Sequence, residues 1–279
     1  MLRRRPPRPA SADDLLTTLG QLTAQARASA ELQRARVELA EVLQREMLPA
    51  SLPDIPGLRT AARYAPARHG LAIGGDWYDG FPLPDGSLAF SVGDVQGHDV
   101  EAAAFMGQIR IGLRAVAAHA PDPGEVLSRA NDLLLSIDCE LFATCTFVRY
   151  DPATRELASA RAGHVPGVWA TTDRRWGLAE DPGGLPLGVL PGQGYPVTRR
   201  RLTAAGTFVL LTDGVVEGPS FPIEAGLAQV ARVVSARAGA DPAETAGAVM
   251  GVAELTGHTD DAAVIVLRHG ADGAGAGAG

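Results

Sequence analysis

Acidic residues recur beside glycines at the ends of segments that are rich in strand-forming residues. They fall in residues 74–79, 90–99, 209–214 and 259–261. Aspartate is depleted in strands, and a buried carboxylate is costly unless a cation or a metal ion compensates it. The chain has no lysine, and the first three of these segments contain no arginine. Their carboxylates therefore need a positive partner from elsewhere.

Divalent metal ions are the partner that these residue types favour. Carboxylates, backbone carbonyls and waters suit hard octahedral cations such as Mg²⁺ or Mn²⁺. Two such ions ~3.5–4 Å apart can hold a phosphate group and turn a water between them into a nucleophile. The ions would supply the positive charge that lysine supplies in many other phosphate-handling enzymes.

Each acidic motif also has an ordinary structural explanation. Asp213-Gly214 is a common turn pair, and Asp99 could cap a helix that begins at Val100. A histidine beside a helix start, such as His98, is also more often a hydrogen-bonding structural residue. Only the order and spacing of all four motifs together favour metal chemistry.

The basic residues are all arginines, 25 of them in a chain of 279 residues with a net charge of −7. The absence of lysine excludes P-loop NTPases, protein kinases with a β3 lysine and Schiff-base enzymes. The acidic balance argues against nucleic-acid binding, which needs clustered positive charge.

Cys139 and Cys145 form no CxxC pair, so no zinc site is expected. Without a long apolar stretch, we expect a cytoplasmic protein with no membrane insertion.

Short strand-like segments and helical segments follow one another over residues 57–269. Turns such as Asp85-Gly86 join neighbouring strands, and local hairpins of this kind build antiparallel sheets. The expected fold class is therefore α+β. The predicted strands are 59–65, 71–79, 87–94, 142–149, 156–162, 166–171, 197–202, 207–212 and 262–268, and the predicted helices are 99–118, 123–136, 224–237 and 241–254.

Residues 11–48 have the pattern of a long amphipathic helix. Leu15, Leu19, Leu22 and Ala26 follow a 4-3-4 spacing, and an apolar stripe continues after a phase shift. Such a stripe must be buried, either on the chain's own domain or in a helix–helix dimer. Both possibilities stay open from the sequence.

The composition divides the chain into four parts. Prolines end the N-terminal helix and stiffen the segment that follows it. We expect a disordered Arg/Pro-rich tail at 1–10, a helical linker or dimerisation segment at 11–56, a catalytic domain at 57–269 and a disordered Gly/Ala tail at 270–279.

The ordered motifs resemble the PPM-type (protein phosphatase 2C-like) metal-dependent serine/threonine phosphatases, and among them the bacterial SpoIIE/RsbU-like branch. The likeness covers residues 43–268, and its motifs are LQREMLPASLP at 43–53, GGDWYD at 74–79, GDVQGHD at 93–99, FATCTFVRYD at 142–151, AGHVPG at 162–167, LLTDGVVE at 210–217 and TDDAAVIVL at 259–267. This resemblance implies a four-layer αββα sandwich of two antiparallel sheets flanked by helices, preceded by an N-terminal linker helix.

The resemblance also implies roles for individual residues. Asp94 would bridge two Mn²⁺ or Mg²⁺ ions, and the Val95 carbonyl would help to hold one of them. Asp213 and Asp260 would complete the ligands of one ion, and Asp76 would hold the other directly or through water. Asp94 and Asp213 are thus the expected catalytic residues, where a metal-activated water attacks phosphorus.

Several nearby residues receive weaker assignments from the same resemblance. Asp79 is expected to hold a water beside the ions, and Asp261 to orient the final loop. Gln96 stands where animal members place a histidine that is a candidate general acid, and His98 is close to it. His164 is expected to shape a loop near the site. Substrate-binding residues stay unassigned.

The implied substrate is a phosphorylated STAS-domain anti-anti-sigma protein, which places the expected function in sigma-factor regulation. A homodimer through residues 11–48 is the other expected partnership. Two alternatives stay open: a catalytically inactive pseudophosphatase scaffold that binds sigma regulators, and metal-dependent hydrolysis of a small phosphate ester.

Overall fold

The computed structural model describes residues 12–67, 74–97, 100–137, 141–219 and 221–270. Within these ranges it contains two five-stranded sheets and five α-helices. The predicted tail at 1–10, all but the first residue of the predicted tail at 270–279, and the candidate His98 lie outside the described residues.

Both sheets are antiparallel throughout. The first sheet has the strand order β1 (Leu58–Ala65), β10 (Ala262–His269), β9 (Gly206–Leu211), β6 (Gly167–Thr171) and β7 (Trp176–Ala179). The second has the order β2 (Trp77–Pro82), β3 (Leu88–Val95), β4 (Ala143–Asp151), β5 (Glu156–Ala162) and β8 (Thr198–Arg201).

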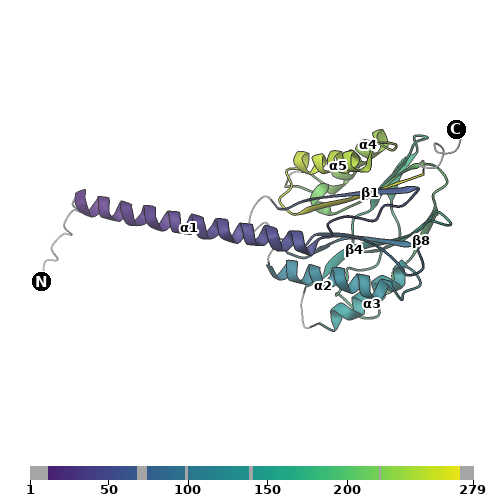
Figure 1. Cartoon of the computed structure of the whole chain (residues 1–279), viewed down its shortest axis with the longest axis horizontal. Helices are drawn as coiled ribbons and strands as arrows, with labels where there is room; N and C mark the ends of the chain where they lie inside the picture. The colour runs from purple at the N-terminus through teal and green to yellow at the C-terminus, as the bar shows by residue number, and fades with distance from the viewer. Residues whose placement is uncertain (1–11, 68–73, 98–99, 138–140, 220, 271–279) are drawn as a thin grey trace, which may run out of the picture.

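Helices cover the outer face of each sheet (Figure 1). The pair α2 (Val100–Ala117) and α3 (Pro123–Leu135) packs on the second sheet, and the pair α4 (Ile223–Ala236) and α5 (Pro242–Thr256) packs on the first. A third apolar cluster, which includes Phe90, Phe208 and Ile265, fills the space between the sheets. The predicted four-layer αββα sandwich is confirmed.

Local sequence signals determine where two of the helices begin. The Asp122 carboxylate accepts a hydrogen bond from the Glu125 N–H at 3.0 Å, and α3 then starts with a proline. Asp241 caps α5 in the same way, since its carboxylate accepts from the Ala243 N–H at 2.8 Å. An aspartate cap followed by proline is a strong helix start, so both boundaries agree with the sequence prediction to within one residue.

The strand register brings the ends of five strands to one edge of the sandwich. β3 ends at Val95 opposite the first residue of β4. In the other sheet β1 ends at Ala65 opposite the first residue of β10, and β9 ends beside that strand. The acidic motifs follow or precede these strand ends, so the antiparallel pairing gathers them at this edge.

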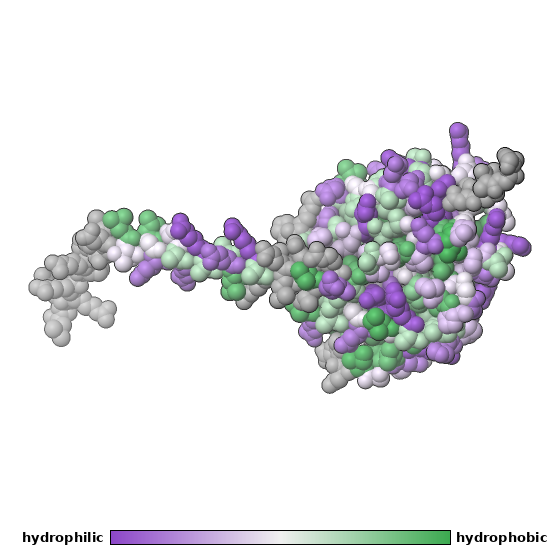
Figure 2. Space-filling view, viewed as in Figure 1, coloured by the Kyte–Doolittle hydropathy of each residue, from purple (hydrophilic) through white to green (hydrophobic). Residues whose placement is uncertain are grey.

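The N-terminal helix α1 (Ala12–Met47) projects from the sandwich (Figure 1). Met47 and Leu48 pack against the core beneath α2, and the Tyr78 hydroxyl donates to the Pro49 carbonyl at 3.3 Å. Every residue from 16 to 35 is exposed, including Leu19 and Leu22. Figure 2 shows hydrophobic and hydrophilic surface side by side along this projecting helix. This part of the stripe therefore does not pack on its own domain. Within the described ranges, no helix combines the length and apolarity needed to cross a bilayer.

Two strand predictions need correction. β2 begins at Trp77 and extends to Pro82, later than the predicted segment at 71–79. Gly74 and Gly75 lie outside the strand, and a Cβ on Gly75 would lie 2.5 Å from the Val95 carbonyl oxygen. The short strand β7 was not predicted, because its four residues show no apolar alternation. It forms by pairing with β6 across a turn in which Arg174 has a φ of 68°.

Candidate functional site

Five predicted acidic residues meet at the edge where the strand ends gather. We call Asp76, Asp94, Asp213, Asp260 and Asp261 the acidic edge. Their carboxylates lie close enough for the negative charges to repel one another. Asp94 interacts with all four of the others: it shares a hydrogen bond with Asp76 and is repelled by the charges of Asp213, Asp260 and Asp261. The structure therefore brings together side chains that are separated by up to 185 positions in the chain (261 − 76).

Asp94 lies near the end of β3, among the four other aspartates of the acidic edge. Burial, followed by repulsion from Asp213 and Asp260, raises the pKa of Asp94 to about 8. A hydrogen bond with Asp76 partly opposes this rise. The pKa of Asp213 is raised as well, by burial and then by the charge of Asp260. Without a cation, the edge therefore retains protons near neutral pH that separate aspartates would lose.

Asp76 is almost fully buried, with 2% of its surface exposed. Burial and then the charges of Asp94, Asp261 and Asp213 raise its pKa well above the usual range, and a hydrogen bond from the Thr212 hydroxyl opposes the shift. Its Oδ2 atom is buried and has no hydrogen-bond partner among the described residues. An unsatisfied buried carboxylate oxygen is costly unless something else binds it.

The donors at this edge fit Mg²⁺ or Mn²⁺. All of the side chains are carboxylates, and the Val95 carbonyl oxygen lies against Gly75, next to Asp76. An all-oxygen set of this kind suits hard cations. Among the described residues, no three His, Cys, Asp or Glu side chains converge as a ready-made metal cage. The carboxylates therefore surround a site that main-chain oxygen and water would have to complete.

Asp261 connects the acidic edge to the end of β1. Its Oδ1 atom accepts a hydrogen bond from the Ala67 N–H at 2.9 Å, and the Tyr64 hydroxyl hydrogen-bonds the same carboxylate. Burial and the nearby charges of Asp261 and Asp76 raise the pKa of Tyr64. The side chain of Asp261 also occupies the space that a Cβ on Gly74 would need. It thus holds two chain segments beside the site, and Tyr64 was not predicted from the sequence.

Asp79 lies on a different face from the acidic edge. It is fully buried, and its carboxylate binds Arg114 through two hydrogen bonds of 2.6 Å and Arg110 through one of 3.1 Å. Side chains alternate along β2, so Asp79 points with Trp77 and Phe81 toward α2. Both oxygens are engaged by arginines, so Asp79 attaches α2 to β2, and its expected water-holding role stays a prediction.

His164 joins the two sheets directly behind the acidic edge. Its Nε2 atom lies 3.0 Å from the Leu211 carbonyl oxygen, and its Nδ1 atom lies 2.7 Å from the Thr144 hydroxyl. Since a carbonyl only accepts, Nε2 carries the proton and Nδ1 accepts from Thr144. Burial lowers the pKa of His164 to about 4, so the ring is neutral at neutral pH.

The partners of His164 explain why it matters to the site. Thr144 pairs with Asp94 in the register of β3 and β4, and Leu211 lies two positions before Asp213. The imidazole therefore fixes the distance between the strand that carries one expected catalytic residue and the strand that carries the other. The predicted loop-shaping role is consistent with this geometry. Gln96, by contrast, is exposed, and its N–H donates to the Phe142 carbonyl.

Several known proteins resemble this chain in sequence, in fold or in both. The model of the SpoIIE family (Stage II sporulation protein E) matches residues 84–270, more than half of the chain. The phosphoserine phosphatase RsbU of Bacillus subtilis (strain 168) is 25% identical over 185 residues, which are 66% of this chain and 54% of RsbU. The chain therefore spans about half the length of that relative.

Solved structures agree with the family match. The RsbU and RsbW domains of Rv1364c from Mycobacterium tuberculosis are 32% identical with a TM-score of 0.72, covering 80% of this chain and 63% of that one. RsbX in complex with magnesium has a TM-score of 0.61 at 15% identity, covering 79% and 99%, which shows the shared fold alone. The αββα sandwich and these matches establish that the chain belongs to the SpoIIE family of PP2C-type phosphatase domains, in the branch that contains RsbU.

Proposed function

We propose that the chain is a Mn²⁺- or Mg²⁺-dependent phosphatase that hydrolyses phosphoserine or phosphothreonine in a protein. The observation that carries this proposal is the acidic edge. Asp76, Asp94, Asp213 and Asp260 have no ion pair with any described arginine or histidine, although burial and mutual repulsion raise the pKa of the first three. In this family fold, such a cluster suits cations rather than the protein's own arginines.

The residues of the acidic edge would divide the ions between them. Asp94 would contact both, the Val95 carbonyl with Asp213 and Asp260 would hold one, and Asp76 would hold the other. Bound ions would supply the positive charge for a phosphate group and the acidity that makes water nucleophilic.

The chain's own groups keep these ligands in place. The Thr212 hydroxyl orients Asp76, while the Val95 N–H donates to the Gly75 carbonyl at 3.2 Å and so holds the chain before β2 against β3. His164 links the two sheets behind the site through its hydrogen bonds with Thr144 and Leu211. Five carboxylates repel a phosphate ester, so the protein without metal should neither bind nor hydrolyse the substrate.

The proposal also names the class of protein substrate. A phosphorylated STAS-domain anti-anti-sigma protein is supported by the likeness to RsbU, a phosphoserine phosphatase, and to a protein that joins RsbU and RsbW domains in one chain. This substrate would place the chain in sigma-factor regulation. The absence of a ready-made metal cage among the described residues favours one competitor, a pseudophosphatase scaffold that binds such regulators without hydrolysing them.

A phosphatase assay separates the two possibilities. The full chain is incubated with Mn²⁺ and either p-nitrophenyl phosphate or a phosphorylated STAS protein, beside Asp94→Asn and Asp213→Asn. Each substitution should lower the rate by more than about 100-fold, because even groups that only support metal ligands are worth 10–100-fold. The exposed Asp173→Asn is the matched control and should keep full activity. Equal rates in all variants refute the proposal, and calorimetry without metal binding favours the scaffold.

We also propose that the projecting part of α1 forms a helix–helix dimer. Leu16, Leu19, Leu22 and Leu32 are each more than half exposed on an amphipathic helix. Sedimentation of the full chain should show a concentration-dependent dimer that deletion of residues 1–48 abolishes. Leu19→Glu should weaken it, whereas Gln21→Glu on the same helix serves as the control. A monomer at high concentration would exclude this interface.

A further inference from the structure

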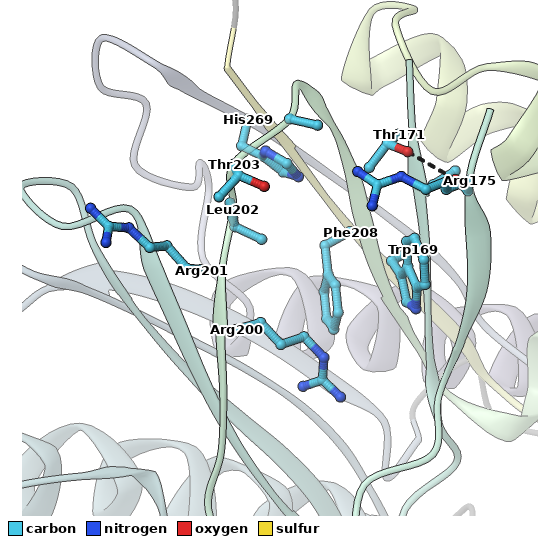
Figure 3. Close-up of a pocket in the computed structure, with 11 residues that line it drawn as sticks. Trp169, Thr171, Arg175, Arg200, Arg201, Leu202, Thr203, Phe208 and His269 are labelled. Carbon is cyan, nitrogen blue, oxygen red and sulfur yellow. Dashed lines mark hydrogen bonds between the residues drawn. The ribbon is translucent and has the colours of Figure 1, made fainter. Parts of the chain in front are cut away.

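A cavity of about 230 Å³ lies at the end of the sandwich opposite the acidic edge. It opens between the last residues of β6, β8 and β10 and the first residues of β9. We call it the distal cavity, and it is lined by Trp169, Ala170, Thr171, Arg175, Arg200, Arg201, Leu202, Thr203, Ala204, Phe208 and His269 (Figure 3). β9 and β10 run the length of the sandwich, so the acidic edge and this cavity lie at opposite ends of the same two strands.

The inner wall of the distal cavity is flat and apolar. Trp169 and Phe208 are paired across β6 and β9, and both contribute to the core between the sheets. Leu202, just after β8, faces them from the other sheet. Two aromatic rings with an aliphatic side chain opposite them suit a planar apolar group.

The remaining wall is polar and carries only positive charge. Figure 3 shows Arg175 extending across the cavity toward Thr203, with Arg200 on the side of the aromatic rings. Arg200 is already neutralised by Asp181, whereas Arg175 forms only an exposed ion pair with Asp173. No carboxylate lines the cavity, although the chain as a whole has a net charge of −7. This wall therefore favours an anion.

His269 adds a polar ring to the lining of the cavity. The residue is 6% exposed, and its ring nitrogens are not among the buried side-chain atoms of the described residues that lack a hydrogen-bond partner. Solvent in the cavity therefore reaches the ring, and a ligand acceptor would take the place of that solvent.

We propose that the distal cavity binds a small organic anion, namely a carboxylate or phosphonate-like group attached to a flat apolar body. The apolar body packs against Trp169 and Phe208. The anionic group accepts hydrogen bonds from the Arg175 guanidinium and the His269 ring. This site does not depend on the phosphatase activity, because its residues lie at the other end of the strands.

Calorimetric titration of the full chain tests this proposal. EDTA is present throughout, so that no metal at the acidic edge competes for the probes. The probes are 2-naphthoate, 2-naphthylphosphonate, the neutral 2-naphthamide and inorganic phosphate. One or both naphthyl anions should bind, and the tighter of the two identifies the preferred head group. The amide should bind about tenfold more weakly, because it lacks the charge that Arg175 recognises.

Three variants make the result specific. Arg175→Gln, on a side chain that is 63% exposed, should weaken anion binding by about tenfold without affecting folding. His269→Phe keeps the packing and should weaken it by about fivefold. Arg199→Gln is the matched control, since Arg199 lies on β8 outside the cavity and pairs with Glu156. Absence of anion binding at millimolar concentration, equal affinity for the amide, or an equal loss in the control variant would each overturn the proposal.

Discussion

Asp76 and Asp79 are three positions apart, and both are buried, yet they lie in opposite electrostatic environments. Asp79 has two arginine partners and a backbone N–H that donates to it at 2.9 Å. Asp76 is repelled by three other aspartates, Asp94, Asp261 and Asp213, and has a buried oxygen without a partner among the described residues. The first environment neutralises its charge completely within the protein, whereas the second leaves charge for a cation to neutralise.

The comparison shows how to separate a structural carboxylate from a ligand. A buried acid saturated by arginines has no lone pairs left for a metal, and its role is to attach one element to another. The Arg114 guanidinium, which also lies 4.6 Å from the centre of the Phe81 ring, makes this attachment of α2 more rigid. A buried acid whose neighbours are acids is stable only with protons or cations.

Removal of Asp79 should have the largest effect on stability. Asp79→Ala leaves Arg110 and Arg114 without their buried counterion and should lower the free energy of unfolding by about 3–5 kcal/mol. Urea denaturation measures this loss. The control is Asp173→Ala, which removes an exposed ion pair with Arg175 and should leave the free energy of unfolding almost unchanged. Similar losses in the two variants would remove the distinction between these aspartates.

The acidic edge should show the opposite pH dependence from an ordinary buried ion pair. The folded-state pKa of Asp94 is about 8, above the value of about 3.9 expected in the unfolded chain. The folded state therefore binds more protons between these limits, and stability should fall as pH rises through them. We expect the EDTA-treated protein to lose about 3–4 kcal/mol between pH 5 and pH 8.

Two measurements sharpen that pH prediction. Asp94→Asn should flatten the decline of stability with pH, since the amide does not titrate. Saturating Mn²⁺ should do the same in the unmodified chain, because bound cations stabilise the charged carboxylates. Stability that rises with pH over this range would mean that the carboxylates are not coupled as described.

Breaking the hydrogen bonds through which His164 links the two sheets should lower stability by a moderate amount. Thr144→Val removes the proton donor to Nδ1, and His164→Gln removes the ring, so each should cost about 1–2 kcal/mol. The double variant should cost much less than the sum, because both substitutions break the same connection. Additive losses in thermal unfolding would show that the two residues act separately.

Substitution of Tyr64 should cause the smallest loss of stability. Tyr64→Phe removes one hydrogen bond to Asp261 and keeps the ring between the sheets, so it should cost about 0.5–1 kcal/mol. Thermal unfolding measures the change, and Tyr150→Phe on the opposite sheet provides a comparison. A loss as large as that of Asp79→Ala would contradict the view that Asp261 has other strong contacts, such as that with Ala67.

Local patterns were sufficient for much of this structure. Strand-like segments, helical segments and turn residues predicted the four helices of the domain and most of its strands, because these signals act over a few residues. β7 escaped prediction because a four-residue edge strand is defined by its pairing with β6 and not by its own composition. The family resemblance carried by the acidic motifs implied which segments would meet. Antiparallel pairing places the end of one strand beside the start of its neighbour, as at Val95 and Ala143.

Contacts between distant residues could not be read in the same way. Arg110 and Arg114 follow Asp79 by 31 and 35 positions, and nothing in the motif at 74–79 indicates that they will reach it. Tyr64 and Asp261 are much farther apart in the chain, and the Tyr64 hydroxyl meets that carboxylate only because β1 pairs with β10.

The sequence by itself determined the fold class, the order of the elements and the positions of the carboxylates, because periodicity and turn chemistry are local properties. Only the tertiary structure decided which carboxylates are neutralised. Asp79 lies within β2 on the face that points toward the arginines of α2, whereas Asp76 lies just before this strand, at the acidic edge. Asp79 thus became a structural anchor, and Asp76 remained available to a cation.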